Sequence, residues 1–146
     1  MKYLVDTNVI SALAPTKSRR PSALVEWMDR RSADLFLSVV TAAEIRVGIA
    51  KSARQGAARK AESLASWWNT VEHLYGDRIL PFDLRAATIA GALSDRAAAR
   101  GLAPGFADIA IASIAEENGL ALLTRNLRDF QAICDRAIDP FVALPD

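Results

Sequence analysis

The feature that most constrains the fold of this chain is the alternation of short apolar runs with longer segments of helical pattern. β-type apolar runs occur at 3–5, 35–39, 78–82 and 120–123, and segments with apolar residues at helical spacing separate them. Uninterrupted runs of this length are typical of strands buried on both faces. Strands that alternate with helices form parallel sheets, so the sequence predicts an α/β fold with a parallel or mostly parallel sheet.

The expected helices lie between these runs. A short helix is expected to end by Pro15, and a second is expected to open at Pro21–Ser22. A third helix is expected to begin at Thr41, and another, capped by Asp83, is expected to end near Gly101. Three more are expected to cover 57–75, 106–117 and 127–133. Pro81 places the 78–82 run near a sheet edge or a strand end. Residues 141–143 are expected to form a last edge strand.

Composition bounds the class of protein. The 146 residues suggest one domain, 1–146, with 51% hydrophobic and 24% charged residues. The net charge of +1 gives no global cationic field, so any nucleic-acid binding must come from local basic patches or from metal ions. The single cysteine, Cys134, excludes an internal disulfide and a cysteine metal cluster. Without a signal peptide or a span of roughly 20 apolar residues, we expect a soluble, cytoplasmic protein with no membrane partner.

Small acidic and amide residues recur at matching places along the chain. Asp6 follows the first apolar run, Glu44 lies in the expected first turn of the helix after the second, and Asp108 opens the 106–117 helix. Asn126 and Asp129 follow the 120–123 run. Because strand ends and the first turns of the following helices share one edge of a parallel sheet, these groups can converge there. The place of Asp108 depends on its helix starting near that edge.

Several of these residues also have a purely structural interpretation. Asp6 or Thr7 could cap a helix, and Asn126 could cap the next one. Thr41 and Glu44 fit a capping box, in which the threonine caps and the glutamate reaches back. Taken singly, each residue is better explained by such a role than by a function.

Asp108 is harder to explain structurally, and the joint pattern favours function. Its neighbours are nearly all apolar, and burying an unpaired carboxylate is costly. Clustered carboxylates also repel one another and need a cation to stay ionised together. Oxygen ligands without supporting cysteine or histidine select a hard ion such as Mg²⁺ or Mn²⁺. That chemistry suits hydrolysis of a phosphodiester.

The sequence resembles the PIN-domain family, and specifically the VapC-type ribonuclease toxins of bacterial type II toxin–antitoxin systems. The matching segments are Leu4–Ile10, Ser38–Gly48 with its Ala-Glu-Ile-Arg-x-Gly core, Ala107–Ala112, and Leu123–Phe130 with its Thr-Arg-Asn-x-x-Asp-Phe pattern. They run in the family's order and span nearly the whole chain. One such segment is weak evidence, whereas four in register are specific.

The resemblance implies a three-layer α/β/α sandwich and a Mg²⁺- or Mn²⁺-dependent endoribonuclease that leaves a 5′-phosphate and a 3′-hydroxyl. Carried over by position, Asp6 and Asp108 would ligate the metal directly, and Glu44 would ligate through water or orient the attacking water. Asn126 stands at the fourth acidic position, where an amide is a weaker ligand than a carboxylate, and Asp129, three residues on, would supply the missing charge. The residues expected to support these groups by hydrogen bonding are Thr7, Asn8 and Thr124.

The resemblance also implies partners. The family forms homodimers and is neutralised by a small cognate antitoxin, whose tail lies across the acidic pocket and whose DNA-binding domain represses the operon. This chain shows no DNA-reading motif of its own. The alternative is a non-catalytic PIN domain that only binds RNA or a partner protein, and the intact acidic set argues against it.

Other chemistry-bearing residues have weaker signals. His73 is expected at the surface, which leaves no basis for a Ser-His-Asp triad. Trp67 and Trp68 are expected to serve the core and an interface rather than to stack on bases. The remaining basic residues form either solvated faces or patches that receive an RNA backbone; these are Lys17, Arg19, Arg20, Lys51, Arg54, Arg59 and Lys60.

Overall fold

The computed structural model describes residues 1–146, and its five strands form one entirely parallel sheet in the order β3-β2-β1-β4-β5. The strands are β1 (Tyr3–Val5), β2 (Leu35–Ser38), β3 (Ile79–Leu80), β4 (Ala121–Leu123) and β5 (Ala137–Ile138). The α-helices are α1 (Thr7–Ile10), α2 (Ser22–Arg30), α3 (Val39–Arg54), α4 (Ala58–Tyr75), α5 (Leu84–Ala99), α6 (Phe106–Glu117) and α7 (Leu127–Phe130). Three short 3-10 helices complete the chain: η1 (Ser11–Leu13), η2 (Ser32–Asp34) and η3 (Gly76–Arg78).

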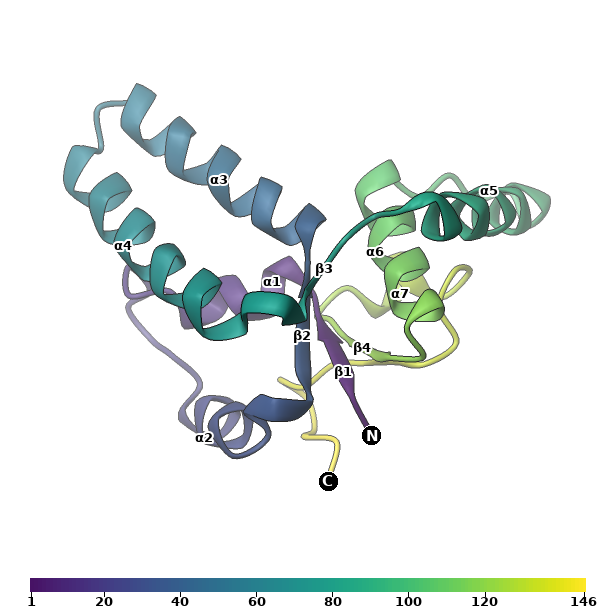
Figure 1. Cartoon of the computed structure of the whole chain (residues 1–146), viewed down its shortest axis with the longest axis horizontal. Helices are drawn as coiled ribbons and strands as arrows, with labels where there is room; N and C mark the ends of the chain where they lie inside the picture. The colour runs from purple at the N-terminus through teal and green to yellow at the C-terminus, as the bar shows by residue number, and fades with distance from the viewer.

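The sheet separates two hydrophobic cores, which confirms the three-layer α/β/α prediction. Side chains alternate along β1, so that Leu4 packs with α5 and α6 while Tyr3 and Val5 pack with α2 and α4. Figure 1 shows α5, α6 and α7 on one side of the central strands and α1 to α4 on the other. Both faces of the sheet are therefore covered, as its uninterrupted apolar strands require.

The carboxyl edge of the sheet is the end from which α1 and α3 begin. Asp6 occupies the N-cap position of α1 and accepts a hydrogen bond from the Thr7 backbone, so Asp6 rather than Thr7 is the cap. The opposite edge is tied by Arg31, which donates to the carboxylate of Asp146 and to the Met1 carbonyl. Both termini accordingly lie together at the amino edge, at the other end of β1 from α1 (Figure 1).

The capping-box prediction for Thr41 and Glu44 is wrong. Helix α3 begins at Val39, and its cap is Ser38, whose Oγ accepts a hydrogen bond from the Thr41 backbone at 3.1 Å. A serine at the very end of β2 satisfies the free amide groups one turn earlier than expected. Glu44 consequently lies in the second turn of α3 rather than the first.

Two expectations near the C-terminus also fail. Residues 141–143 form no strand, because Asp139 and Pro140 turn the chain and the Asp139 carboxylate accepts from the Phe141 amide; the edge strand is β5 instead. Helix α7 ends at Phe130 rather than at 133, and Asn126 precedes it without forming a side-chain cap. The remaining predicted strands and helices are present with small shifts at their ends. None of the helices combines the length and the apolar character needed to cross a membrane.

Candidate active site

Asp6 is held at the carboxyl end of β1 by the pairing of β1 with β4. The parallel register places Val5 beside Leu123, so the residues that follow, Asp6 and Thr124, are also neighbours. Thr124 Oγ1 donates to Asp6 Oδ2 at 2.8 Å, and the Thr7 amide donates to Oδ1 at 2.8 Å. Asp6 is only 4% exposed, and burial raises the pKa of its carboxyl although both hydrogen bonds oppose the rise. The carboxyl is thus fixed in position and costly to ionise.

Glu44 is joined to the sheet by a run of hydroxyl groups. Thr7 Oγ1 donates to Glu44 Oε1 at 2.6 Å, which leaves Thr41 Oγ1 as the donor in its 2.8 Å contact with Thr7 Oγ1. Ser38 Oγ in turn donates to Thr41 Oγ1 at 3.3 Å. The hydroxyl donors therefore all point the same way, from the end of β2 toward one oxygen of an exposed carboxylate.

Asp108 lies in the first turn of α6, beside the same edge. Helix α6 leads into β4 and runs antiparallel to it, so the start of the helix returns to the carboxyl ends of the strands. Partial burial and the nearby Asp6, Asp129 and Glu44 carboxylates, in that order of effect, raise the pKa of Asp108 to about 6. The Asp6, Asp129 and Glu44 carboxylates therefore all lie close enough to Asp108 to disfavour its ionisation.

Asp129, rather than Asn126, faces Asp108. Asp108 and Asp129 line one open pocket of about 380 Å³ together with Arg128. The Asn126 side chain forms no hydrogen bond; its backbone amide donates to Thr124 Oγ1 at 3.0 Å. The Thr-Arg-Asn turn therefore holds Asn126 by its backbone amide. The fourth carboxylate of the site comes from Asp129 in α7.

Asn8 connects the acidic centre to the segment after β4. Its Oδ1 accepts from the Arg125 amide at 3.1 Å, and its Nδ2 lies 3.5 Å from Thr124 Oγ1. Thr7, Asn8 and Thr124 thus form the hydrogen-bonded frame around Asp6. Sequence reasoning placed these three residues next to the acids but could not specify which oxygen each would contact.

The donor set fits a hard divalent cation by its chemistry. It offers carboxylate oxygens and no cysteine or histidine, and their mutual repulsion favours a positive charge between them. As the side chains stand, no three acidic, histidine or cysteine groups are close enough to form one coordination shell. Mg²⁺ commonly binds through one or two carboxylates and keeps several waters, so a full protein shell is not required.

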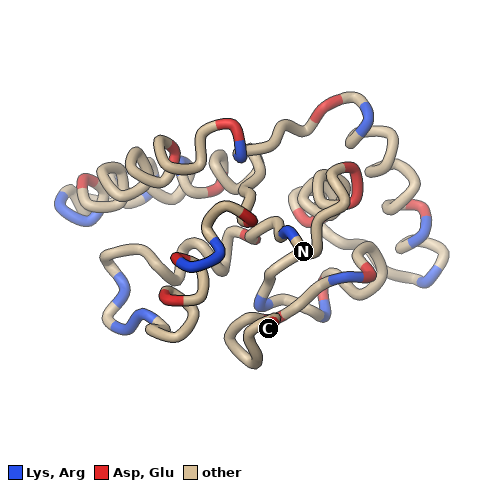
Figure 2. Tube along the Cα trace, turned by 60° about the horizontal axis from the view of Figure 1, so that its bottom comes forward, with Lys and Arg blue, Asp and Glu red and all other residues tan.

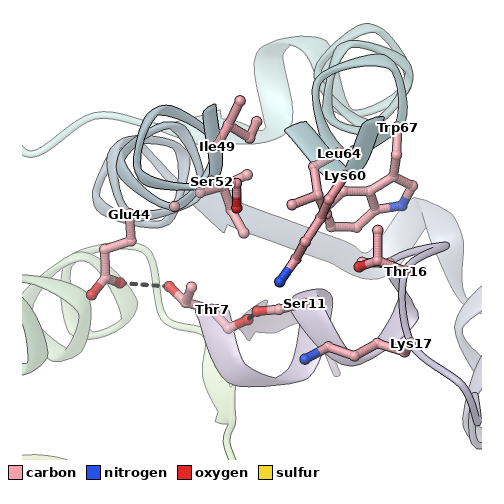
Figure 3. Close-up of a pocket in the computed structure, with 13 residues that line it drawn as sticks. Thr7, Ser11, Thr16, Lys17, Glu44, Ile49, Ser52, Lys60, Leu64 and Trp67 are labelled. Atoms are coloured by element: carbon pink, nitrogen blue, oxygen red, sulfur yellow. Dashed lines mark hydrogen bonds between the residues drawn. The ribbon is translucent and has the colours of Figure 1, made fainter. Parts of the chain in front are cut away.

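A groove that sequence reasoning missed adjoins the acidic centre. It has a volume of about 310 Å³ and runs between α1, α3 and α4, with Thr7 and Glu44 at one end. Figure 3 shows Ile49, Leu64 and Trp67 on its wall and the Lys60 ammonium pointing into it. The spacing of Ile45 with Ile49, and of Leu64 with Trp67, could have signalled two helix stripes that face each other. Trp68 is fully buried, as the core interpretation of this pair predicts.

The family-model comparison identifies the fold family. The model described as "PIN domain" matches residues 3–135, which include every residue of the acidic centre. The chain belongs to the PIN domain family. The family expectation taken from the four sequence segments is therefore confirmed.

Two named relatives and one solved structure are similar over nearly the whole PIN domain. Plasmid stability protein StbB of Pseudomonas syringae is 35% identical over 96% of this chain and 99% of its own length. VapC ribonuclease Y4jK of Sinorhizobium fredii is 33% identical over 94% of this chain and 96% of its own length. The crystal structure of FitAcB from Neisseria gonorrhoeae overlaps with a TM-score of 0.83 at 31% identity, covering 95% and 98% of the two chains. In further similar structures, FitAB and the VapBC of Salmonella typhimurium are bound to DNA.

Proposed function

We propose that this PIN domain is a Mg²⁺- or Mn²⁺-dependent endoribonuclease that acts as the toxin of a toxin–antitoxin pair. The observation that carries the proposal is the convergence of Asp6, Glu44, Asp108 and Asp129 on one sheet edge, where the pKa of Asp108 rises to about 6. None of these acids forms an ion pair with a basic side chain of the protein, so a bound cation would relieve their mutual repulsion. The names of the relatives, among them a VapC ribonuclease, support RNA as the substrate.

The roles of the acids follow from how each is held. Asp6 and Asp108 would hold the cation, which when bound supplies charge stabilisation at the phosphate. Thr7 fixes one oxygen of Glu44 and leaves the other free, so Glu44 can accept a proton from the attacking water. Water would then add to phosphorus as the bond from phosphorus to the 3′-oxygen breaks. The departing 3′-oxygen takes up a proton from solvent and Glu44 returns its proton to solvent, which leaves a 5′-phosphate and a 3′-hydroxyl. Asp129 would contribute negative charge beside Asp108, and Asn126 is left to shape the turn.

The proposed protein partner is a small antitoxin with its own DNA-binding domain. The similar structures of FitAB and VapBC bound to DNA support such a complex. The groove beside Glu44 combines apolar walls with access to the acidic centre, which suits an antitoxin segment that brings an Arg or Lys to the carboxylates. That side chain would take the place of the cation's charge.

A homodimer is also part of the proposal. Leu84 and Phe106, at the starts of α5 and α6, are 85% and 69% exposed. Phe106 also lines an apolar pocket between these helices, together with Phe82 and Ile109, that a second copy would cover. Light scattering of the purified chain would report its mass directly, and a monomer at all concentrations would contradict this part.

Cleavage of total RNA tests the proposed activity. With Mg²⁺ the protein should cut RNA, with EDTA it should not, and Asp6→Asn or Asp108→Asn should lower the rate by at least about 100-fold, since each removes a charge at the reacting centre. Asp95→Asn is the matched control, because Asp95 is an exposed acid on α5 with no ion pair. Full activity in both site variants would overturn the assignment, and no cleavage with either metal would favour the binding-only alternative.

A further inference from the structure

A second site lies beside the acidic centre, on the far side of α1 and η1. It is an open pocket of about 620 Å³ with a strongly basic lining: Lys17, Arg19 and Arg20 from the loop after η1, and Arg125 from the turn after β4. Asn8, Ser11, Ala12, Pro21 and Phe141 complete the lining, so no acidic residue faces these cations. We call these four basic residues the basic pocket.

The charges of the basic pocket are not neutralised within the molecule. The ion pairs of the structure use only Arg31 and Arg46 as cations. Arg20 makes one long contact to the Leu13 carbonyl at 3.5 Å, and no side chain of the pocket contacts a carboxylate. Four cations that share a pocket repel one another, and a polyanion that binds there relieves the repulsion.

Arg125 is held by an aromatic ring and lies next to the acidic centre. Its guanidinium lies 4.1 Å from the centre of the Phe141 ring, a cation–π contact that holds the side chain over the pocket. Its backbone amide donates to Asn8, which contacts Thr124, which in turn donates to Asp6. A series of hydrogen bonds therefore connects this cation to the acidic centre and fixes their relative position.

Lys17 continues the pocket toward Glu44. Lys17 and Ser11 line both the basic pocket and the groove that holds Thr7 and Glu44 (Figure 3). The acidic centre thus adjoins an opening with basic walls, although the chain as a whole carries a net charge of only +1. Elsewhere, acidic and basic positions are interspersed along the Cα trace (Figure 2).

We propose that the basic pocket binds the phosphate backbone of single-stranded RNA beside the scissile bond, with Lys17, Arg19, Arg20 and Arg125 as the phosphate contacts. This inference rests on the proposed nuclease function and specifies how its substrate is held. Exposed loop cations with no acidic partner suit the phosphate backbone, whose contacts do not depend on base identity. An acidic partner protein is the competing occupant, and the test below separates the two.

The test is RNA binding with cleavage blocked. Full-length protein in EDTA is titrated into a fluorescein-labelled single-stranded RNA of about 16 nucleotides, and anisotropy is followed at several salt concentrations. The variants are Arg19→Gln with Arg20→Gln, and Arg125→Gln. The matched control is Arg30→Gln with Arg100→Gln, because both residues are exposed and lie outside the pocket and the ion pairs. Circular dichroism and a melting curve verify that every variant is folded.

The expected result is a loss of affinity confined to the pocket variants. The double variant should bind about tenfold more weakly at low salt, and the slope of log K against log salt should become shallower by about 0.7 for each lost phosphate contact. Control variants should bind as the wild type does. Unchanged affinity in the pocket variants, equal loss in the controls, or no RNA binding by the wild type would each overturn the proposal.

Two further arms separate the possible failures. If a poly-glutamate peptide bound with the same dependence on Arg19, Arg20 and Arg125 while RNA affinity did not, the pocket would belong to an acidic partner and the proposal would be wrong. Cleavage is measured separately with Mg²⁺. If RNA binding depended on the pocket but no RNA were cleaved, the proposed nuclease would be refuted and the basic pocket supported. If RNA were cleaved but binding did not depend on the pocket, the nuclease would be supported and the basic pocket refuted.

Discussion

At the scale of single residues, Asp108 concentrates the electrostatic conflict of the site. Its carboxyl is partly buried, accepts no hydrogen bond from the protein and is surrounded by the charges of Asp6, Asp129 and Glu44. By contrast, the Asp6 carboxylate accepts hydrogen bonds from two protein donors, and the Glu44 carboxylate accepts one. Asp108 is therefore the residue whose ionisation most opposes folding when no cation is bound.

Replacing Asp108 with asparagine should stabilise the metal-free protein at neutral pH. The unfolded chain loses the Asp108 proton near pH 4 and the folded chain near 6, so the wild type loses stability as the pH rises through that window. Because solvent screens part of the effect, we expect a gain of about 1 kcal/mol for Asp108→Asn at pH 7.5 and almost none at pH 4.

Urea unfolding in EDTA at these two pH values measures the difference. Asp95→Asn serves as the control, since no carboxylate repulsion is relieved there. A variant less stable than the wild type at pH 7.5, or equally stabilised at both pH values, would contradict the electrostatic account of Asp108.

At the scale of elements, the start of α3 couples helix stability to the site. Ser38 caps the helix through its Oγ and also begins the hydroxyl series that ends on Glu44. The capping box at Thr41 was a reasonable sequence prediction, but the pattern could not reveal that a serine in the strand would cap first. Thr41 is thereby released to contact Thr7 across the sheet edge.

Ser38→Ala should therefore lower both stability and cleavage. Loss of the cap should cost about 1 kcal/mol of unfolding free energy, and the less ordered Thr41 and Thr7 hydroxyls should slow RNA cleavage. Asp83→Ala is the matched control, because Asp83 caps α5 through the Ala86 amide and has no bond to the acidic centre. It should destabilise the protein without a comparable loss of cleavage below the melting temperature. Equal effects of both variants on cleavage would show that Ser38 acts only through stability.

At the scale of the whole molecule, the sheet order explains what the sequence could and could not predict. Alternating strands and helices are enough to predict the α/β class, and the residues that follow β1 and β4, Asp6 and Thr124, are neighbours because those strands lie side by side in the sheet. The groove and the basic pocket depend on how α3, α4 and the loop after η1 pack against one another. The apolar stripes of α3 and α4 are visible in the sequence, but the way they meet is not. The same limit applies to Asp129, which reaches Asp108 only through the packing of α7 near α6.

The central claim is that the acids of this edge form one metal centre, and calorimetric titration of the protein with Mn²⁺ tests it most directly. The wild type should bind Mn²⁺, Asp6→Asn and Asp108→Asn should each weaken binding by at least about tenfold, and Asp95→Asn should bind like the wild type. Binding should also raise the melting temperature of the wild type but not of the two site variants. Wild-type Mn²⁺ affinity in Asp6→Asn and Asp108→Asn, or no Mn²⁺ binding by the wild type, would contradict the claim.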